Sequence, residues 1–298
     1  MQTYPAERIT TGYSWTECPR WHDGSFYFSD MYNRRVMRVA EDGTAEVFLD
    51  LSGREGLDGQ DVVLIGTGFL PDGRLLVNSM HERVVLVYDG AEVGLYADLR
   101  QVATGPINDM VVDAHGRAYV TQLGFELFQG ESPKESYIIV VEPDGSSRDL
   151  IEAGAVMGAN GIALSADGAT LVTAEAFANR ITAFDLSPDR VVTGRRVFAE
   201  VTELPDGMCL DAEGAAWVAQ PTGAGAIRIL DGGDVVAKVT VPAEEAGNSV
   251  ACVLGGPDRR SLYLCCGFEV FDAGKSRCEG QGSIWRAAVP VTAGEARP

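Results

Sequence analysis

One short pattern recurs six times along the chain and constrains the fold more than any other feature of the sequence. Each copy is an apolar strand, a tight turn that usually ends in glycine, and a second strand rich in Val, Tyr, Leu and Ala. The copies read WHDGSFYFSD (21–30), LPDGRLLVNS (70–79), DAHGRAYVTQ (113–122), SADGATLVTA (165–174), DAEGAAWVAQ (211–220) and GPDRRSLYLC (256–265). The turn residues before the glycine or its equivalent are Asp23, Asp72, His115, Asp167, Glu213 and Asp258, separated by 43 to 52 residues. Because a four-stranded blade has this length, the repeat predicts an all-β fold in which residues 1–298 form a single six-bladed β-propeller domain.

The two ends of the chain are predicted to share one blade. The last copy lacks the turn glycine, and the strand-like segment GSIWRAAV (282–289) that follows it is too short to complete four strands. The segment ERITTGYSW (7–15) precedes the first copy and reads as another strand. Pairing of the two segments would close the ring and remove an open sheet edge.

The charge and composition of the chain limit the classes of partner that it is expected to bind. The chain carries 43 acidic and 24 basic residues, a formal net charge of −19, which opposes binding to nucleic-acid phosphates or to an anionic membrane surface. The first residues show no signal-peptide pattern, and no run of 18 apolar residues occurs. We therefore expect a cytoplasmic protein that acts on a small molecule, with neither nucleic acid nor membrane as partner; the oligomeric state stays open.

Four polar residues stand at one phase of the repeat. In a propeller the first strand of each blade lines the central channel, so residues at its start converge on the axis at one end. Counting back six positions from the turn residue in the first copy, and seven in the third to fifth copies, gives Glu17, Asn108, Asn160 and Asp206. The equivalent positions of the second and sixth copies are Ile65 and Ala251, so a polar side chain is not part of the repeat itself.

Two carboxylates and two amide carbonyls that converge would repel one another unless a cation lay between them. An oxygen-only ligand set predicts one divalent metal ion, preferably Ca²⁺, with Mg²⁺ or Mn²⁺ also suitable and Zn²⁺ less favoured without His or Cys. The competing interpretation is that Asn-Gly in GANGIAL and Asp-Gly in LPDGMCL are turn formers held by local backbone hydrogen bonds. Their common phase in four copies favours a site at the channel mouth.

Other chemistry has little support in the sequence. The three histidines, His22, His81 and His115, stand in no nucleophile-elbow or metal-protease motif, and no phosphate-binding glycine motif is present. The six cysteines form no C-x-x-C pair and are expected to be buried free thiols. Cys18 adjoins Glu17, and strand alternation predicts that it faces away from the metal. Phe125 and Phe128 lie in the long loop LGFELFQGESPKES and are candidates for a pocket lid.

The chain also resembles a known family along nearly its whole length. The segments ECPRW, PINDMVVDAHGRAYVT, ANGIALSADGATLVTAE, LPDGMCLDAEGAAWVA and GGPDRRSLYL occur in this order, and they are similar to the SMP-30/gluconolactonase/LRE (regucalcin-like) family. The resemblance implies a six-bladed propeller with one divalent metal in its channel and hydrolysis of lactones, while related propellers act on phosphotriesters. It further implies that Glu17, Asn160 and Asp206 are metal ligands, that Asn108 is a ligand or a substrate contact, and that Asp206 is the candidate general base.

One position departs from the family. An Arg that holds the polyol substrate in sugar lactonases commonly stands two residues before the equivalent of Asn108, and here that position is Pro106. A substrate-contacting carboxylate of those proteins aligns with Glu126, which could also be a solvated loop residue.

The sequence thus predicts a divalent-metal-dependent hydrolase of a lactone or related ester, in which the metal polarises the carbonyl group and Asp206 acts as general base. Two alternatives stay open. One is an organophosphate or phosphotriester hydrolase on the same metal site, and the other is a non-catalytic calcium- or ligand-binding propeller.

Overall fold

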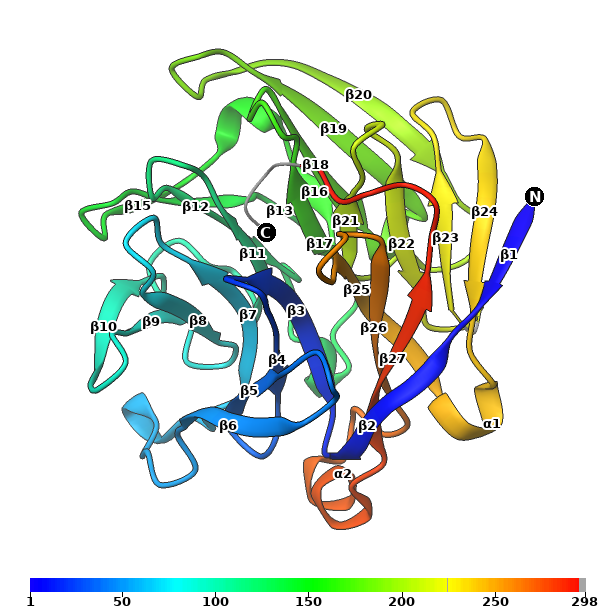
Figure 1. Ribbon diagram of the computed structural model, residues 1–298. Coiled ribbons are helices and arrows are strands. Elements are labelled where there is room, and N and C mark those ends of the chain that lie inside the picture. The colour runs from blue at the N-terminus through cyan, green and yellow to red at the C-terminus, as the bar shows by residue number, and fades with distance from the viewer. Residues whose placement is uncertain (224, 295–298) are drawn as a thin grey trace.

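Six blades, each built on four antiparallel strands, surround a central channel in the computed structural model, which describes residues 1–223 and 225–294 (Figure 1). Neighbouring inner strands contact one another around the ring, and β25 of the last sheet contacts β3 of the first. The chain is therefore an all-β, six-bladed β-propeller, as the sequence repeat predicts.

Each blade runs from a channel-lining strand to an outer strand. The first three blades consist of β3 (Thr16–His22), β4 (Ser25–Asp30), β5 (Arg35–Val39) and β6 (Ala45–Asp50); β7 (Leu64–Phe69), β8 (Leu75–Ser79), β9 (Val84–Tyr88) and β10 (Val93–Asp98); and β11 (Ile107–Val112), β12 (Ala118–Gln122), β14 (Ile139–Val141) and β15 (Ser147–Asp149). The last three consist of β17 (Ala159–Leu164), β18 (Thr170–Glu175), β19 (Arg180–Leu186) and β20 (Val192–Glu200); β21 (Met208–Leu210), β22 (Ala216–Gln220), β23 (Gly225–Ile229) and β24 (Val235–Thr240); and β25 (Asn248–Gly255), β26 (Ser261–Gly267), β27 (Gly282–Ala288) and β2 (Glu7–Tyr13).

Short elements decorate the blades. The two-stranded ribbon of β13 (Glu135–Ser136) and β16 (Val156–Met157) lies beside the third blade, and the α-helices are α1 (Ala243–Ala246) and α2 (Ala273–Glu279). Single 3₁₀ turns form η1 (Leu57–Gly59), η2 (Leu127–Gln129), η3 (Ile151–Ala153) and η4 (Ala176–Ala178). Across residues 1–223 and 225–294 no helix is long and apolar enough to span a membrane.

The ring is closed by pairing of segments from the two ends of the chain. Strand β2 pairs antiparallel with β27, with Glu7 opposite Arg286 and Thr10 opposite Ile284, so the prediction that the two ends share a blade is confirmed. The preceding strand β1 (Gln2–Pro5) adds in parallel to the outer edge of β24 in the fifth blade. This second attachment covers another open edge and was not predicted from the sequence.

The repeated turns close the hairpins between the first and second strands of the blades. Gly168 has φ of +67° in the fourth hairpin, a left-handed conformation that glycine adopts without steric cost. Arg259 takes the same place in the sixth hairpin with φ of +58°. The missing glycine of the last copy is therefore replaced by a strained arginine, and the turn is kept.

The hydrophobic core is divided into layers between adjacent blades. Along β12, Val120 packs with Leu76 of the second blade, whereas its neighbour Tyr119 packs with Phe184 of the fourth. Successive strand residues point to opposite faces of a sheet. Each blade therefore contributes side chains to the two layers that flank it, and the rigid ring holds the inner strands in fixed positions.

Candidate metal centre

The four polar residues singled out by the repeat lie at one end of the channel. Glu17 is in β3, Asn108 in β11 and Asn160 in β17, while Asp206 lies two residues before β21. All four stand where an inner strand begins, at the end opposite the repeated hairpin turns. Glu17, Asn108 and Asp206 are buried and Asn160 is half-buried.

β-bulges present three of these side chains, those of Glu17, Asn108 and Asn160. Glu17 pairs with Ser29, and the next paired residue of β3 is Arg20, which pairs with Tyr27. The same irregularity occurs in β11 and in β17. A bulge redirects side chains that regular alternation would place on the face of the sheet, and bulges are frequent beside functional sites.

The bulge also overturns the expectation for Cys18. Its backbone is left-handed, with φ of +43°, so strand alternation does not apply at this residue. The Cys18 thiol lies 3.7 Å from Glu17 Oε2 instead of facing away from it. Of the six cysteines, Cys278 is exposed and the other five are buried; all six are free thiols, as expected.

Glu17 and Asp206 are close enough to influence each other's charge. The Glu17 carboxylate accepts hydrogen bonds from Trp15 Nε1 at 3.3 Å and from the Cys18 amide at 3.1 Å. Burial, assisted by the nearby charge of Asp109, raises the pKa of Glu17 to about 7, although these hydrogen bonds oppose the rise. The pKa of Asp206 is raised well above its usual value by burial and then by the Glu17 charge, while a hydrogen bond from the Asn160 side chain opposes the rise. Glu17, Asn160 and Asp206, three of the four predicted residues, therefore lie close enough to interact electrostatically.

Two buried oxygens in this group lack partners. Asn108 Oδ1 and Asp206 Oδ1 find no hydrogen-bond donor among the residues that the structure describes. A buried acceptor left without a donor costs about 1–3 kcal/mol. A hard divalent cation would satisfy both oxygens and offset the repulsion between the two carboxylates, so the donor set fits such an ion. The described ranges contain no cluster of three or more His, Cys, Asp or Glu suited to a metal, because this set depends on its two amides.

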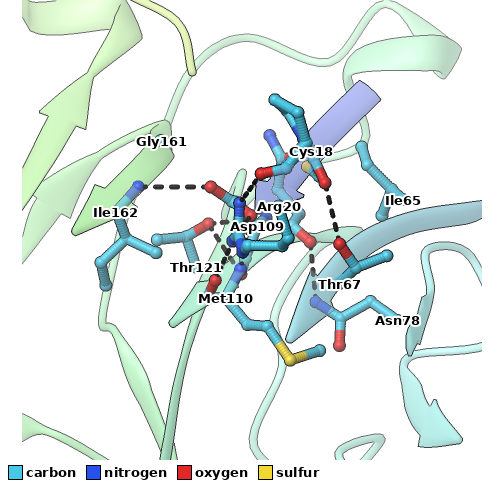
Figure 2. Close-up of polar contacts among 12 residues, drawn as sticks. Cys18, Arg20, Ile65, Thr67, Asn78, Asp109, Met110, Thr121, Gly161 and Ile162 are labelled. Carbon is cyan, nitrogen blue, oxygen red and sulfur yellow. Dashed lines mark hydrogen bonds and ion pairs between the residues drawn. The ribbon is translucent and has the colours of Figure 1, made fainter. Parts of the chain in front are cut away.

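A buried ion pair in the channel was missed by the sequence analysis (Figure 2). Arg20 Nη2 lies 2.6 Å from Asp109 Oδ1, and the two side chains are 6% and 4% exposed. Arg20 also donates to the carbonyls of Pro19 and Met110, while the Met110 amide donates to Asp109 Oδ1 at 2.8 Å. The pair links the first blade to the third, directly beside the candidate residues.

Side chains of the second strands hold the backbone of the next inner strand. Asn78 Nδ2 donates to the Asn108 carbonyl at 2.7 Å, and Thr121 Oγ1 donates to the Asn160 carbonyl at 2.8 Å. Ser29 Oγ bonds the Ile65 carbonyl in the same manner at 2.6 Å. Each of these residues is the ninth of its decapeptide copy, and a small polar residue recurring there inside an apolar strand is the signal that could have revealed this support.

Glu126 lies in the loop after β12 at the same end of the propeller. It is half-buried and forms an ion pair with Arg83, which follows β8 in the second blade. Arg83 also donates to the Ala103 carbonyl at 3.3 Å. Pro106 immediately precedes β11, and its carbonyl accepts a hydrogen bond from the Leu123 amide at 3.0 Å. A role for Glu126 in substrate binding stays a prediction.

A cavity of about 870 Å³ opens at the other end of the channel, among the hairpin turns. Trp21, His22, Asp167 and Arg259 are among its lining residues. None of the four candidate ligands lines it; Arg20 does. The candidate metal centre and this cavity therefore lie on opposite sides of the Arg20–Asp109 ion pair.

Comparisons with known proteins agree with this fold. The structure defines the protein as a six-bladed propeller whose channel mouth is lined with oxygen atoms. The sequence model of the family described as SMP-30/Gluconolactonase/LRE-like region matches residues 15–267. The chain belongs to this family.

Relatives in the family carry different names. Regucalcin of Xenopus laevis is 27% identical over 199 residues, covering 63% of this chain and 60% of that protein, so the match spans about three fifths of the length of that relative. Pentonolactonase XacC of Haloferax volcanii is 26% identical over 257 residues, covering 83% and 80%.

Solved structures show the same fold. A gluconolactonase of Xanthomonas campestris superposes with a TM-score of 0.74 at 23% identity, covering 95% of this chain and 89% of that one. A calcium-binding regucalcin of Agrobacterium tumefaciens superposes with a TM-score of 0.76 at 18% identity, covering 98% and 97%.

Proposed function

We propose that this protein is a divalent-metal-dependent hydrolase of a lactone or related ester, with Glu17, Asn108, Asn160 and Asp206 around the metal. The observation that carries the proposal is the pair of buried, donor-free oxygens on Asn108 and Asp206 beside a second carboxylate. The pentonolactonase among the relatives supports lactone chemistry, and the calcium-binding regucalcin with this fold supports Ca²⁺ as the preferred ion.

A divalent cation bound there would polarise the ester carbonyl and stabilise negative charge on its oxygen. Glu17 and Asn160 would hold the cation, and Asn108 would either complete the ligand set or contact the substrate. Asp206 accepts a proton from the attacking water. Asp206 suits this role because its Oδ1 atom has no hydrogen-bond donor among the described residues and is therefore free to accept a proton.

The supporting shell keeps these groups in place. Asn78 and Thr121 fix the backbone at Asn108 and Asn160 through the hydrogen bonds described above. Arg20 holds Asp109 next to Asn108. Such support matters because a ligand or base displaced by about 1 Å can lower the rate by a factor of about 10².

The test is hydrolysis by metal-loaded protein of a panel of lactones, aryl esters and phosphotriesters. Asp206→Asn keeps the size of the side chain and one oxygen, and it should lower turnover of a lactone or ester by a factor of about 10² or more at saturating metal. The matched control is Asp189→Asn, an exposed residue of the turn between β19 and β20, which should leave the rate unchanged.

The outcomes separate the candidate functions. An unchanged rate in Asp206→Asn would remove the general-base role, and Glu126 would be the next residue to substitute. Turnover of phosphotriesters but not of lactones would make the protein a phosphotriesterase. Tight metal binding without turnover of any compound in the panel would favour a calcium- or ligand-binding propeller.

A further inference from the structure

Two loops from opposite sides of the ring meet above the candidate metal centre. Phe128 lies in η2 of the third blade and Phe271 in the loop between β26 and β27 of the sixth blade, and their ring centroids are 5.9 Å apart. His81, after β8 of the second blade, stands 5.4 Å from the Phe128 ring. Since the third and sixth blades face each other across a six-bladed ring, this contact spans the channel.

The strand directions place the contact at the end of the channel where the candidate ligands lie. Inner strands run from the candidate ligands to the hairpin turns, and second strands return, so the loops after β8, β12 and β26 lie at the candidate site. Tyr32, after β4, donates its hydroxyl to the Val270 carbonyl in the loop that carries Phe271. Burial and then the charge of Glu17 raise the pKa of Tyr32. The Tyr32 hydroxyl therefore ties this loop to the first blade, which also carries Glu17.

The underside of these loops is apolar. Phe128 and Val270 pack against the buried cluster that includes Trp15, Tyr32 and Met80, and Trp15 is hydrogen-bonded to Glu17. Phe271 itself is 70% exposed, so part of its ring is open to a ligand. We call Phe128 and Phe271 the roof.

Glu126 and Arg83 near the roof are paired with each other, and His81 is neutral. The Glu126 carboxylate is held by the Arg83 guanidinium, so each of these two groups already has a charged partner. Burial lowers the pKa of His81, which keeps its imidazole neutral at pH 7. Pro106, immediately before β11, has no side-chain donor.

We propose that the roof selects lactones and esters whose substituent is an apolar alkyl or aryl group, and that it disfavours lactones with several hydroxyl groups. The choice of substrate class rests on the proposed hydrolase function. The preference itself is a binding property, because burying an apolar substituent against Phe128 and Phe271 removes their surface from water.

The experiment compares two unhydrolysable δ-lactams with the same six-membered ring, 6-pentylpiperidin-2-one and glucono-δ-lactam, by calorimetric titration of the metal-loaded protein. The pentyl lactam is expected to bind about 10-fold more tightly or better, a ratio typical of a few methylenes in an apolar pocket. Phe128→Ala and Phe271→Ala should each reduce that ratio about 5-fold. Leu95→Ala, a 57%-exposed residue of outer strand β10, is the matched control and should leave it unchanged.

Hydrolysis of δ-decanolactone and glucono-δ-lactone gives the second measurement, as the ratio of their kcat/KM values. The proposal predicts a ratio that favours δ-decanolactone and falls in both Phe variants, whose folding is checked by thermal unfolding. Equal or tighter binding of glucono-δ-lactam, binding of neither lactam, or a preference insensitive to both Phe substitutions would overturn it. Selective pentyl-lactam binding without turnover of either lactone would instead reject the hydrolase function and keep the selectivity.

Discussion

The Arg20 guanidinium and the Asp109 carboxylate form an ion pair inside the channel, with Nη2 and Oδ1 2.6 Å apart. The two residues are 89 positions apart in the chain and belong to the first and third blades. Asp109 adjoins Asn108, and its charge contributes to the raised pKa values of Glu17 and Asp206. The same ion pair thus links two blades of the ring and places a charge beside the candidate site.

Removing one partner of this ion pair should destabilise the fold strongly. Arg20→Met leaves the Asp109 carboxylate buried without its cation, and we expect the free energy of unfolding to fall by about 3–5 kcal/mol. The double variant Arg20→Met/Asp109→Asn should recover part of that loss. Arg38→Met, which breaks the exposed pair of Arg38 and Glu46, should cost less than about 1 kcal/mol. Urea unfolding at pH 7 measures all three, and a loss in Arg20→Met no larger than in Arg38→Met would contradict the expectation.

Metal binding should stabilise the protein. Addition of Ca²⁺ to EDTA-treated protein should raise Tm, with a gain of about 2.7 kcal/mol at a free-ion concentration 100 times Kd. The double variant Glu17→Gln/Asp206→Asn should lose this response, and Asp189→Asn should keep it. Differential scanning fluorimetry with Ca²⁺, Mg²⁺, Mn²⁺ and Zn²⁺ provides the measurement. A full response in the double variant would move the metal site elsewhere.

The stability of the metal-free protein should depend on pH because Glu17 is buried. Folding raises its pKa from 4.5 to about 7, so the stability associated with the protonated acid is complete below pH 4.5 and is lost as pH rises through 7. Glu17→Gln imitates the protonated acid. In EDTA the variant should therefore match the wild type near pH 4.5 and exceed its stability at pH 8, by on the order of 1–3 kcal/mol. Chemical unfolding across this pH range tests the sign, and a variant less stable than wild type at pH 8 in EDTA would refute it.

The sixth hairpin should gain stability from the glycine that its sequence lacks. Arg259 has φ of +58°, and Arg259→Gly should raise the stability by about 0.5–1 kcal/mol because the steric strain exceeds the entropic cost of glycine. Arg260→Gly, at the next residue, is the control. Arg260 is exposed and is not among the residues with positive φ, so glycine there should lower the stability by a similar amount. Thermal unfolding of both variants measures these two changes in stability.

Much of the fold could be read from local sequence. The hairpin turns at Asp23 and Asp167 could be predicted because a turn depends on a few adjacent residues. The spacing of the repeated turns then gives the number of blades. The closing pair of β2 and β27 followed from a shortage of strands in the last blade. The parallel addition of β1 to β24 could not be foreseen, because a short exposed strand carries no pattern that names its partner.

The candidate site was predicted only in part. The phase of the repeat identified Glu17, Asn160 and Asp206, and the structure brings these three together, although their metal-binding role stays a prediction. The orientation of Cys18 was wrong because a bulge interrupts the alternation that sequence reasoning assumes. Arg83, the partner of Glu126, gave no signal, since an arginine after a strand is ordinary surface composition.

The sequence by itself determined the periodic features: six blades, the hairpin turns between their strands, and which polar side chains share one end of the channel. The tertiary structure alone decided the contacts across the ring, namely Arg20 with Asp109 and Phe128 with Phe271. Repeats encode local turns and alternating burial, which each blade expresses independently of the others. Contacts between blades that are not neighbours depend on the closure of the ring, a property of the whole chain that no local segment records.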